Sequence, residues 1–341
     1  MSTADRIPTI RDVAAHAGVS KSLAALVLRG DPGVSDARRR AVLLAVDELG
    51  YRPNRAARTL GARRSGTVGV LLNDLRNPWF VDLLAGLTAT LDTVGLAPVL
   101  VDSATTRRVG GAPVEMLLRQ QVDGIVVVGT TEDGAALERA ASAVPVVLAG
   151  TYEPDGLHAD VVVNDDEAGS VLATEHLLSL GHRRVLHLAG PGRVGEIRAG
   201  AYRSVMLAAG LDPWLVAGGM TEESGYAAAH RALAGADRPT AVFAYNDLSA
   251  IGALSAADDL GLRVPEDVSL VGYDNTYLGG IRHISLTSID NGTFAIGVQA
   301  ARWLAERIAG DDQTARVHRV PVSLQVRATT ARLADGPAPG R

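Results

Sequence analysis

Residues 9–50, TIRDVAAHAGVSKSLAALVLRGDPGVSDARRRAVLLAVDELG, decide how the first part of this 341-residue chain folds. Thr9 followed three positions later by Asp12 is typical of a helix start, because each side chain can bond the other residue's backbone N–H. We expect a first helix over 10–17, followed by a tight turn that Gly18 tolerates. The stretch therefore opens with a short helix and a turn.

Two more helices follow from the same kind of signal. Ser20 can cap a second helix over 21–28, which the Gly, Asp and Pro residues beyond it interrupt. Ser35 can cap a third helix over 36–49, whose apolar residues recur at helical spacing. Two short helices across a glycine turn, braced by a third, predict a helix-turn-helix geometry. A purely structural three-helix cap is the alternative.

Charge is unevenly divided along the chain, whose net charge is -5. Residues 1–64 hold 12 Lys and Arg against 6 Asp and Glu, whereas residues 65–341 hold 21 against 32. A basic head on an acidic body favours contact between the head and a polyanion, although a solvated basic face has the same composition. Ser20-Lys21-Ser22 favours nucleic acid, since it puts polar groups at the helix end that would enter a major groove.

Composition excludes several classes of protein. With 47% hydrophobic and 21% charged residues, the chain is typical of a globular protein of two or three domains. It has no cysteine, so disulfides, thiolate catalysis and Cys-based zinc sites are excluded. Its histidines lack metal-ligand spacing, its start lacks a secretory signal, and it has no apolar run long enough to span a membrane. We expect a cytoplasmic protein without a bound metal.

The N-terminal stretch resembles the DNA-binding module of the lac repressor and galactose repressor (LacI/GalR) family of transcription regulators. The matching motifs are Asp12-Val13-Ala14, Ala17-Gly18-Val19-Ser20, Val34-Ser35 and Leu49-Gly50-Tyr51-Arg52-Pro53-Asn54. The chain departs from the family pattern at Leu23-Ala24-Ala25-Leu26, where Thr-Val-Ser-Arg is usual. Two polar positions that often face DNA are lost there, which leaves more of the base recognition to Lys21 and Ser22.

The resemblance implies a hinge after the head. Residues 52–65 form an Arg-rich linker that is too short for a stable helix in water. In the family this segment pairs with its dimer mate in the minor groove and wedges a leucine between base steps. Leu60 stands where that leucine belongs and Ala57 where the two helices touch, so we expect the segment to fold only on DNA. The DNA-binding residues implied by the resemblance are Thr9, Ser20, Lys21, Ser22, Arg29, Asn54, Arg55, Ala57 and Leu60.

From Gly66 onward, short apolar runs alternate with helical stretches, a pattern that predicts parallel sheets. We expect strands at 68–72, 98–101, 125–128, 146–148, 161–163, 184–188, 214–217, 241–244, 268–271 and 286–289. We expect helices at 79–93, 168–180, 196–209, 248–260 and 295–309. Ten strands are more than one such sheet usually contains. We therefore predict two doubly wound α/β lobes with a ligand cleft at the carboxyl ends of their strands.

The stretch 190–195, GPGRVG, has the G-x-G-x-x-G form of a dinucleotide-binding turn. Such a site needs an acidic residue at the end of the next strand, but Gly218-Gly219-Met220 follows the strand at 214–217. The glycines are better explained as a loop that lines the cleft and leads to Arg198. We therefore expect no cofactor.

The body resembles the family's effector-binding core over its whole length. The matching motifs are Asn77-Pro78-Trp79-Phe80, Asp123-Gly124-Ile125, Leu180-Gly181-His182-Arg183-Arg184, Asn246-Asp247, Val264-Pro265-Glu266-Asp267-Val268, Gly272-Tyr273-Asp274 and Leu286-Thr287-Ser288-Ile289. The effector-binding residues implied by the resemblance are Trp79, Phe80, Arg198, Asn246, Asp247, Asp274 and Asn291. Together they offer hydrogen-bonding groups and a ring face for stacking.

Some of these residues also suit purely structural roles. Asp247 and Asp274 could cap a helix or a turn, and Trp79 could pack in a core. The chain also departs from the family pattern, with Asn164-Asp165 near a lobe crossover where Asp-Asn is usual, and Ala201 where Gly is common. The identity of the effector is open between sugars, sugar derivatives, nucleosides and purines.

We predict four segments: a helix-turn-helix domain at 1–51, a hinge at 52–65, a core at 66–330 and a flexible tail at 331–341. Within the core, the resemblance implies a fold like that of periplasmic binding proteins. One lobe takes 66–163 and 292–319, and the other takes 164–291 and 320–330.

The predicted function is sequence-specific transcription regulation, with repression favoured over activation. A homodimer would bind a pseudo-palindromic operator, and a sugar or related effector between the lobes would control that affinity. No heptads follow Arg327, which predicts dimers without a tetramerising coil. The alternatives are a solute-binding protein of a transport system and a nucleotide-cofactor enzyme. The chain has no G-x-S-x-G, H-E-x-x-H or P-loop motif, so we expect no enzyme activity.

Overall fold

The computed structural model describes residues 8–28, 31–51, 64–129, 134–152 and 157–333. The chain divides into two compact units, residues 1–65 and residues 66–341, and each is described by itself. Among the described residues, no helix has both the length and the apolar character that a membrane span requires.

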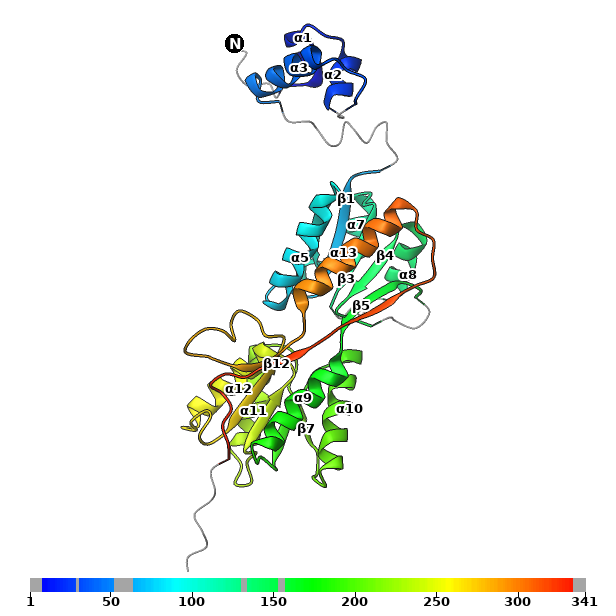
Figure 1. Ribbon diagram of the computed structural model, residues 1–341. Helices are drawn as coiled ribbons and strands as arrows, with labels where there is room; N and C mark the ends of the chain where they lie inside the picture. Colours follow the sequence, from blue (N-terminus) through cyan, green and yellow to red (C-terminus); the bar gives the residue numbers. More distant parts are fainter. Residues whose placement is uncertain (1–7, 29–30, 52–63, 130–133, 153–156, 334–341) are drawn as a thin grey trace, which may run out of the picture. The chain divides into compact units, whose positions relative to one another are not determined.

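The first unit is a three-helix domain (Figure 1) made of α1 (Ile10–His16), α2 (Lys21–Leu28) and α3 (Asp36–Glu48). Thr9 and Asp12 form a capping box at the start of α1, in which Asp12 Oδ2 accepts from the Thr9 backbone N–H at 2.7 Å and from the Thr9 hydroxyl at 2.6 Å. Ser20 caps α2, because its hydroxyl accepts from the Leu23 N–H at 3.2 Å. Ser35 stands at the expected N-cap position of α3 but makes no side-chain capping bond to a described residue, so the expected N-cap positions are confirmed and the capping bonds are present at Thr9 and Ser20.

One apolar core holds the three helices together. Gly18 has a φ of +64°, in the left-handed region that favours glycine, and this turn lets α2 fold back against α1. His16 Nε2 of α1 also lies 2.6 Å from Glu48 Oε2 at the end of α3. The buried core residues are Val13, Ala14, Ala24, Val27, Val34, Val42, Ala45 and Tyr51.

The described part of the second unit contains two six-stranded sheets, each the centre of one lobe. The strands of the first lobe are β1 (Thr67–Leu72), β2 (Ala97–Asp102), β3 (Gly124–Val128), β4 (Val146–Ala149), β5 (Asp160–Asn164) and β11 (Val317–Val320). They run parallel in the order β11-β5-β4-β3-β1-β2. A short helix, α6 (Ser103–Arg108), follows β2.

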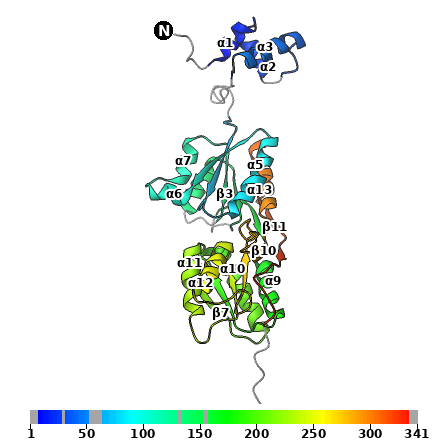
Figure 2. The same ribbon diagram turned by 90° about the vertical axis from the view of Figure 1, so that its left-hand side faces the viewer.

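Helices cover both faces of this sheet (Figure 2). On one face lie α5 (Trp79–Thr93) and α13 (Thr293–Ala309), and on the other α7 (Pro113–Arg119) and α8 (Gly134–Ala143). Strand β1 shows why: Val68 and Val70 belong to the core under α5 and α13, whereas Leu71 belongs to the core under α7 and α8. Successive strand residues point to opposite faces, so apolar residues at consecutive positions need helices on both sides.

The second lobe repeats this architecture. Its strands are β6 (Val185–Ala189), β7 (Trp214–Ala217), β8 (Ala241–Ala244), β9 (Ser269–Tyr273), β10 (Thr287–Asp290) and β12 (Ser323–Gln325), in the order β12-β10-β9-β8-β6-β7. Only β12 among them pairs antiparallel. One face packs against α11 (Glu222–Leu233) and α12 (Asp247–Asp259), the other against α9 (Asp166–Ser179) and α10 (Gly192–Ala208).

The chain crosses between the two lobes three times (Figure 1). It leaves the first lobe between β5 and α9, returns between β10 and α13, and leaves again between β11 and β12. Because β11 pairs with β5 and β12 pairs with β10, both sheets include strands from distant parts of the sequence. Each lobe is therefore discontinuous in the chain.

The predicted fold class, a helical head followed by two doubly wound lobes, is confirmed. All the strands expected from the sequence are present, with bounds that differ by at most two residues. The sequence did not predict β11 and β12, nor the helices α6, α7, α8 and α11. In β11 only Val320 is buried, so no apolar run marks this edge strand, and β12 is three residues long.

A histidine is buried in the core of the second lobe. His187 on β6 stacks on Phe243, with ring centroids 4.6 Å apart, and lies 5.1 Å from the ring of Tyr202. Its Nδ1–H donates to the Phe243 carbonyl oxygen at 2.9 Å, whereas Nε2 has no partner among the described residues. Burial lowers the pKa of His187 to about 4, because the charged ring would lose its hydration.

Because His187 is buried, we expect the wild type to lose stability as the pH is lowered. A His187→Phe variant should not show this part of the loss. Between pH 6.5 and 4 the unfolded chain binds the His187 proton and the native protein does not, so stability falls as the pH is lowered. One such proton changes the free energy of unfolding by about 1.4 kcal/mol per pH unit. Urea unfolding of both proteins from pH 4.5 to 7.5 measures the difference. Parallel pH profiles would contradict a neutral, buried His187.

Candidate functional site

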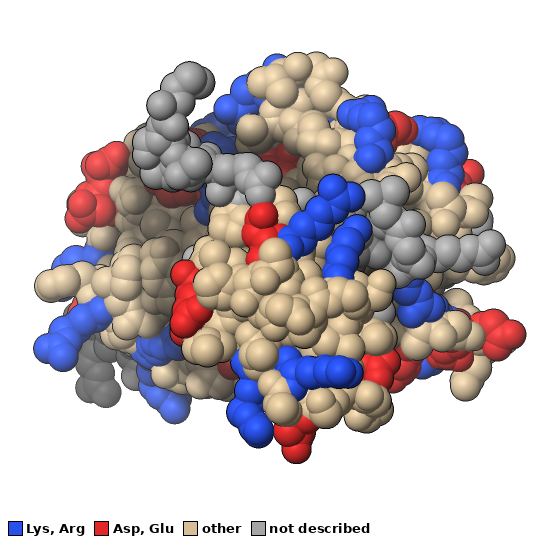
Figure 3. Space-filling view, turned by 90° about the horizontal axis from the view of Figure 1, so that it is seen from above, with Lys and Arg blue, Asp and Glu red and all other residues tan. Residues whose placement is uncertain are grey.

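The exposed polar groups of α2 lie in its first turn. Lys21 and Ser22 are exposed, whereas every later residue of α2 is half-buried or buried against the other helices. Thr9 and Ser20, the two N-caps, are exposed as well. The space-filling view from above shows Lys and Arg side chains with Asp and Glu side chains among them (Figure 3). Of the described residues of α2, Lys21 and Ser22 are the ones whose side chains can reach a partner freely.

The other predicted DNA-binding residues lie outside the described residues. They are Arg29, Asn54, Arg55, Ala57 and Leu60. Their roles remain predictions from the sequence and from the family resemblance.

A cavity of about 50 Å³ is walled by residues of both lobes. It lies at the carboxyl ends of the strands, since Gly129, Gly150, Tyr245 and Asp274 directly follow β3, β4, β8 and β9. This is where ligands of parallel α/β sheets gather. The lining residues are Asn77, Trp79, Gly129, Gly150, Asn164, Val194, Arg198, Met220, Tyr245, Asn246, Asp274 and Asn291.

Five of the seven predicted effector-binding residues line this cavity: Trp79, Arg198, Asn246, Asp274 and Asn291. The structure thus brings together side chains from five separate elements or loops. The two others, Phe80 and Asp247, are not on its wall.

Arg198 on α10 is the charged centre of the cavity wall. Its side chain is 5% exposed, Nε donates to Asp166 Oδ1 at 2.8 Å, and Nη1 donates to the Tyr245 carbonyl oxygen at 2.7 Å. The guanidinium carbon lies 3.5 Å from the centre of the Tyr273 ring and 4.8 Å from that of Tyr245. Although burial disfavours the charge, Asp166 raises the pKa of Arg198, so the guanidinium stays protonated.

Asp166, the first residue of α9, holds Arg198 in place. Its carboxylate also accepts from Asn164 Nδ2 at 2.8 Å and from the Tyr152 hydroxyl at 3.2 Å. Asn164 in turn donates to the Tyr273 hydroxyl at 3.1 Å. This network spans the β5–α9 crossing, because Tyr152 and Asn164 belong to the first lobe and Arg198 and Tyr273 to the second.

Asp274 faces the same cavity from the end of β9. Its φ of +101° lies in a region that side chains rarely adopt, and such strain is typical of functional positions. Asn291 Nδ2 donates to Asp274 Oδ1 at 2.9 Å. Burial raises the pKa of Asp274 well above its ordinary range, although Arg198 opposes this effect. The side chain is therefore a strong acceptor when ionised and can donate when protonated.

Trp79 and Asn246 also line the cavity. The Trp79 ring packs against Gly150, where any larger residue would overlap it, and its buried Nε1–H has no partner among the described residues. Asn246 Oδ1 accepts from the Ser249 N–H at 2.8 Å, which caps α12, and its Nδ2 donates to the Met220 carbonyl at 3.0 Å. The Trp79 ring therefore has a fixed position in the cavity wall.

Phe80 and Asp247 have structural contacts instead. Phe80 is 2% exposed in the core of the first lobe, edge-on to Trp79. Asp247 Oδ2 accepts from the Thr276 N–H at 2.6 Å and its hydroxyl at 2.8 Å, and Oδ1 accepts from the Ser288 hydroxyl at 2.6 Å. These three bonds hold the loop after β9. Asp274 is the first residue of that loop, so Asp247 helps to position Asp274 without lining the cavity itself. Burial raises the pKa of Asp247 to about 6 despite them.

Several wall residues were not predicted. Asn77, Asn164 and Tyr245 line the cavity, and Asp166 and Tyr273 hold Arg198. Three of them could have been predicted from their positions next to the ends of expected strands. Asn164 and Tyr273 end β5 and β9, and Tyr245 follows β8, so all stand at carboxyl ends of predicted strands.

The three glycines of GPGRVG have structural explanations in the β6–α10 turn. A side chain at Gly190 would overlap the Tyr245 ring, and one at Gly195 would overlap the Gly190 carbonyl. Gly192 has a φ of +70°. The turn is therefore tight because Tyr245 and α10 pack closely on it, and this packing positions Arg198 one turn further along.

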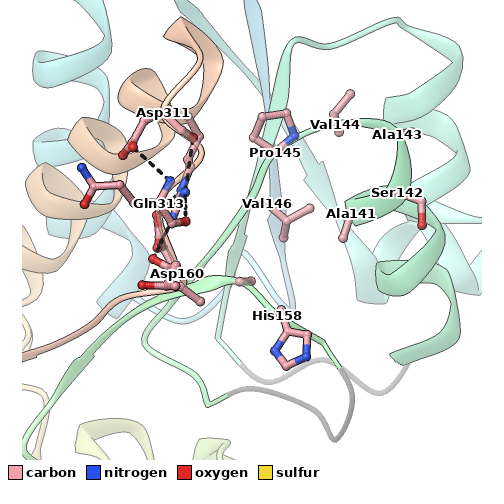
Figure 4. Close-up of a pocket in the computed structure, with 14 residues that line it drawn as sticks. Ala141, Ser142, Ala143, Val144, Pro145, Val146, His158, Asp160, Asp311 and Gln313 are labelled. Carbon is pink, nitrogen blue, oxygen red and sulfur yellow. Dashed lines mark hydrogen bonds and ion pairs between the residues drawn. The ribbon is translucent and has the colours of Figure 1, made fainter.

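A larger hollow, of about 710 Å³, lies at the amino ends of β4 and β5 (Figure 4). Its charged groups pair with one another: Arg307 and Arg316 lie 2.7 and 2.9 Å from the two oxygens of buried Asp160. Although burial alone would raise it, these bonds lower the pKa of Asp160 to about 2. Since its charges are already paired, we interpret this cluster as a structural link between β5 and α13. Elsewhere in the described residues, no group of His, Asp and Glu side chains could hold a metal ion.

Comparison with known proteins gives consistent matches along the chain. Residues 9–54 match the family described as bacterial regulatory proteins, lacI family, and residues 174–330 match the periplasmic binding protein-like domain. The HTH-type transcriptional repressor PurR of Vibrio vulnificus (strain CMCP6) is 31% identical, over 95% of this chain and 99% of its own length.

Two solved structures cover nearly the whole chain. The lac repressor dimer bound to operator and the anti-inducer ONPF has a TM-score of 0.81 at 28% identity, covering 96% of this chain and 100% of that one. The transcriptional regulator CelR–cellobiose complex has a TM-score of 0.69 at 32% identity, covering 94% and 99%.

A helix-turn-helix head joined to a two-lobed core with a cavity between its lobes defines a ligand-responsive regulatory protein. The chain belongs to the lacI family of bacterial regulatory proteins. It is a DNA-binding transcription regulator.

The packing of the GPGRVG turn predicts that Gly195→Ala destabilises the protein by about 1–3 kcal/mol, since the new methyl group overlaps backbone. Gly200→Ala is the matched control, because it lies on the same helix with nothing near its added methyl group. It should be neutral or stabilising by up to about 1 kcal/mol. Urea unfolding measures both changes. A Gly195→Ala variant as stable as the wild type would contradict the packing explanation. Because the GPGRVG turn is not expected to bind a dinucleotide, NAD should leave the melting temperature of the wild type unchanged.

Proposed function

We propose that this protein is a repressor whose operator affinity is controlled by a small polyhydroxylated metabolite, a sugar or a sugar derivative, bound in the cavity between the lobes. The observation that supports this most is the cavity wall, where Arg198, Asn246, Asp274 and Asn291 converge beside the face of Trp79. Amide, carboxylate and guanidinium groups around an aromatic ring suit a ring-shaped ligand with several hydroxyls. CelR, a related protein, has been solved with cellobiose.

The size of the cavity supports coupling between the effector and the shape of the core. Ligand pockets for small molecules commonly enclose roughly 300–1,000 Å³. The cavity encloses about 50 Å³, so a sugar enters only if the lobes separate. The effector would then bind one arrangement of the lobes more tightly than the other, and such a difference in affinity is what allosteric control requires.

The head supports operator binding. Lys21 and Ser22 stand exposed at the start of α2, the position from which a recognition helix contacts base edges. Thr9 and Ser20 are expected to contact the phosphate backbone, together with Arg29, Asn54 and Arg55, which lie outside the described residues. Ala57 and Leu60, also outside them, are proposed to pair and to wedge in the minor groove.

The assembly and location follow from the same proposal. A homodimer places two heads in successive major grooves of a pseudo-palindromic operator, as in the lac repressor dimer solved on its operator. PurR is named as a transcriptional repressor, which favours repression here. We propose that the protein acts in the cytoplasm and catalyses no reaction.

Lys21→Ala tests the head. Operators are first selected from a random duplex pool, and affinity is then measured at several salt concentrations. Loss of one base or phosphate contact should weaken binding by about 1–3 kcal/mol, or roughly 5- to 150-fold. Arg302→Ala is the control, since it removes one exposed positive charge from α13 of the core. Equal affinities of Lys21→Ala and wild type would contradict the predicted role of α2.

Arg198→Lys tests the cavity. The lysine keeps a positive charge beside Asp166 but cannot bond Asp166, the Tyr245 carbonyl and a ligand with donors fixed in one plane, so effector affinity should fall roughly 10- to 100-fold. Operator binding without effector should be unchanged. The measurement is the metabolite concentration that releases labelled operator, after a metabolite screen on the wild type. A normal response in Arg198→Lys would remove the cavity from the proposal.

A further inference from the structure

We propose that Asp166 makes this cavity selective for uncharged metabolites, so that the effector is a neutral, hydroxyl-bearing molecule and phosphorylated or carboxylated metabolites are rejected. The inference rests on the proposed effector role of the cavity and narrows the class of ligand. Asp166 does not itself line the cavity, and it acts through Arg198 as a specificity-determining residue.

Two charged side chains stand on the cavity wall. Among the described residues that line the cavity, Arg198 is the single cation and Asp274 the single acid. A buried phosphate or carboxylate needs a positive partner to replace its hydration, since an unpaired charge in a protein interior is disfavoured by several kcal/mol. In this cavity Arg198 would have to be that partner.

Asp166 already neutralises Arg198. The two side chains are 2.8 Å apart and are 5% and 1% exposed, so solvent hardly screens their attraction. The carboxylate is fixed by Asn164 and Tyr152, which donate to it at 2.8 and 3.2 Å. Arg198 therefore presents a hydrogen-bond donor to the cavity without an unbalanced charge.

The surroundings of the guanidinium also restrict how it can hold an anion. Nη1 is bonded to the Tyr245 carbonyl oxygen, and the Tyr273 ring covers a face of the group at 3.5 Å. A phosphate or carboxylate is held best by two parallel N–H bonds from one arginine. Among the described residues, Nε and one of the two Nη1 N–H groups are already used, which leaves Nη2 and the other Nη1 N–H for a ligand, in a group whose charge Asp166 balances.

Asp274 adds repulsion on the same wall. With Asp274 ionised, the three groups Arg198, Asp166 and Asp274 sum to one negative charge, and with Asp274 protonated they sum to zero. In neither state is the wall positive. Neutral ligands meet no such barrier, because the amides of Asn246 and Asn291 on the cavity wall can bond hydroxyls and ring oxygens without needing a net charge.

Asp166→Asn tests this inference, because the amide keeps the shape and an acceptor for Arg198 but removes the negative charge. The probe is inorganic phosphate at 10 mM, with chloride at equal ionic strength as the reference. We expect no change in the melting temperature of the wild type and a rise of about 3 °C in Asp166→Asn, as for a ligand at roughly ten times its Kd.

Asp165→Asn is the matched control. It removes the same charge one residue away, where the carboxylate caps α9 by accepting from the Ala168 N–H at 2.9 Å and does not line the cavity. We expect no phosphate effect in this variant. The inference is overturned if phosphate stabilises the wild type, if Asp165→Asn behaves like Asp166→Asn, or if folded Asp166→Asn gains nothing.

A second measurement uses the wild type alone and compares how neutral and anionic metabolites affect operator binding. Wild-type protein on labelled operator is titrated with matched pairs: glucose and glucose 6-phosphate, ribose and ribose 5-phosphate, cellobiose and cellobionate, adenosine and adenosine monophosphate. The neutral member should release DNA at a concentration at least about 100-fold lower than its anionic partner. Release by an anionic member at the lower concentration overturns the inference and leaves effector control intact. If no compound in a wider metabolite screen changes operator affinity in either direction, the proposed effector control fails, and the inference fails with it.

Discussion

The buried ion pair between Arg198 and Asp166 anchors the interior of the core. Its carboxylate belongs to the first helical residue after the β5–α9 crossing, and its guanidinium belongs to the helix that follows the GPGRVG turn. Breaking a buried pair leaves an uncompensated charge, so both elements are held in one arrangement. The cavity wall follows from this constraint, because Tyr245, Tyr273 and Asn164 all contact one of the two partners or each other.

The three crossings limit how the lobes can move. A single connection would allow the lobes to turn freely, whereas three roughly adjacent ones favour hinge or shear closure about the crossing region. The cavity is lined by residues at two of these crossings, Asn164 and Asn291. A ligand there acts on the segments whose backbone angles must change when the lobes open. Under the proposed effector control, small shifts at the cavity would therefore be converted into displacement of whole lobes.

Much of this structure was predictable from local sequence, and the rest was not for identifiable reasons. Capping residues and apolar runs are local signals, so Thr9, Ser20 and the buried strands could be placed in advance. Strand β11 exposes Val317, His318 and Arg319, and its place in the sheet depends on pairing with β5, which lies far away in the chain. Similarly, the family resemblance implies Asp247 as an effector-binding residue, whereas Thr276 and Ser288 bond its carboxylate here. Asp166 was overlooked because its importance comes from a partner 32 positions away.

The order in which the lobes are completed has a consequence for synthesis of the protein. The core of the first lobe includes Ile296, Ala300 and Leu304 of α13, although its first strand begins at Thr67. On the ribosome, domains ordinarily fold as they emerge, starting from the N-terminus. Here the first lobe waits, with its apolar sheet face uncovered, until the second lobe and α13 have been translated. The nascent chain therefore exposes part of this apolar core during most of its synthesis, while the three-helix head, which is continuous in sequence, can fold at once.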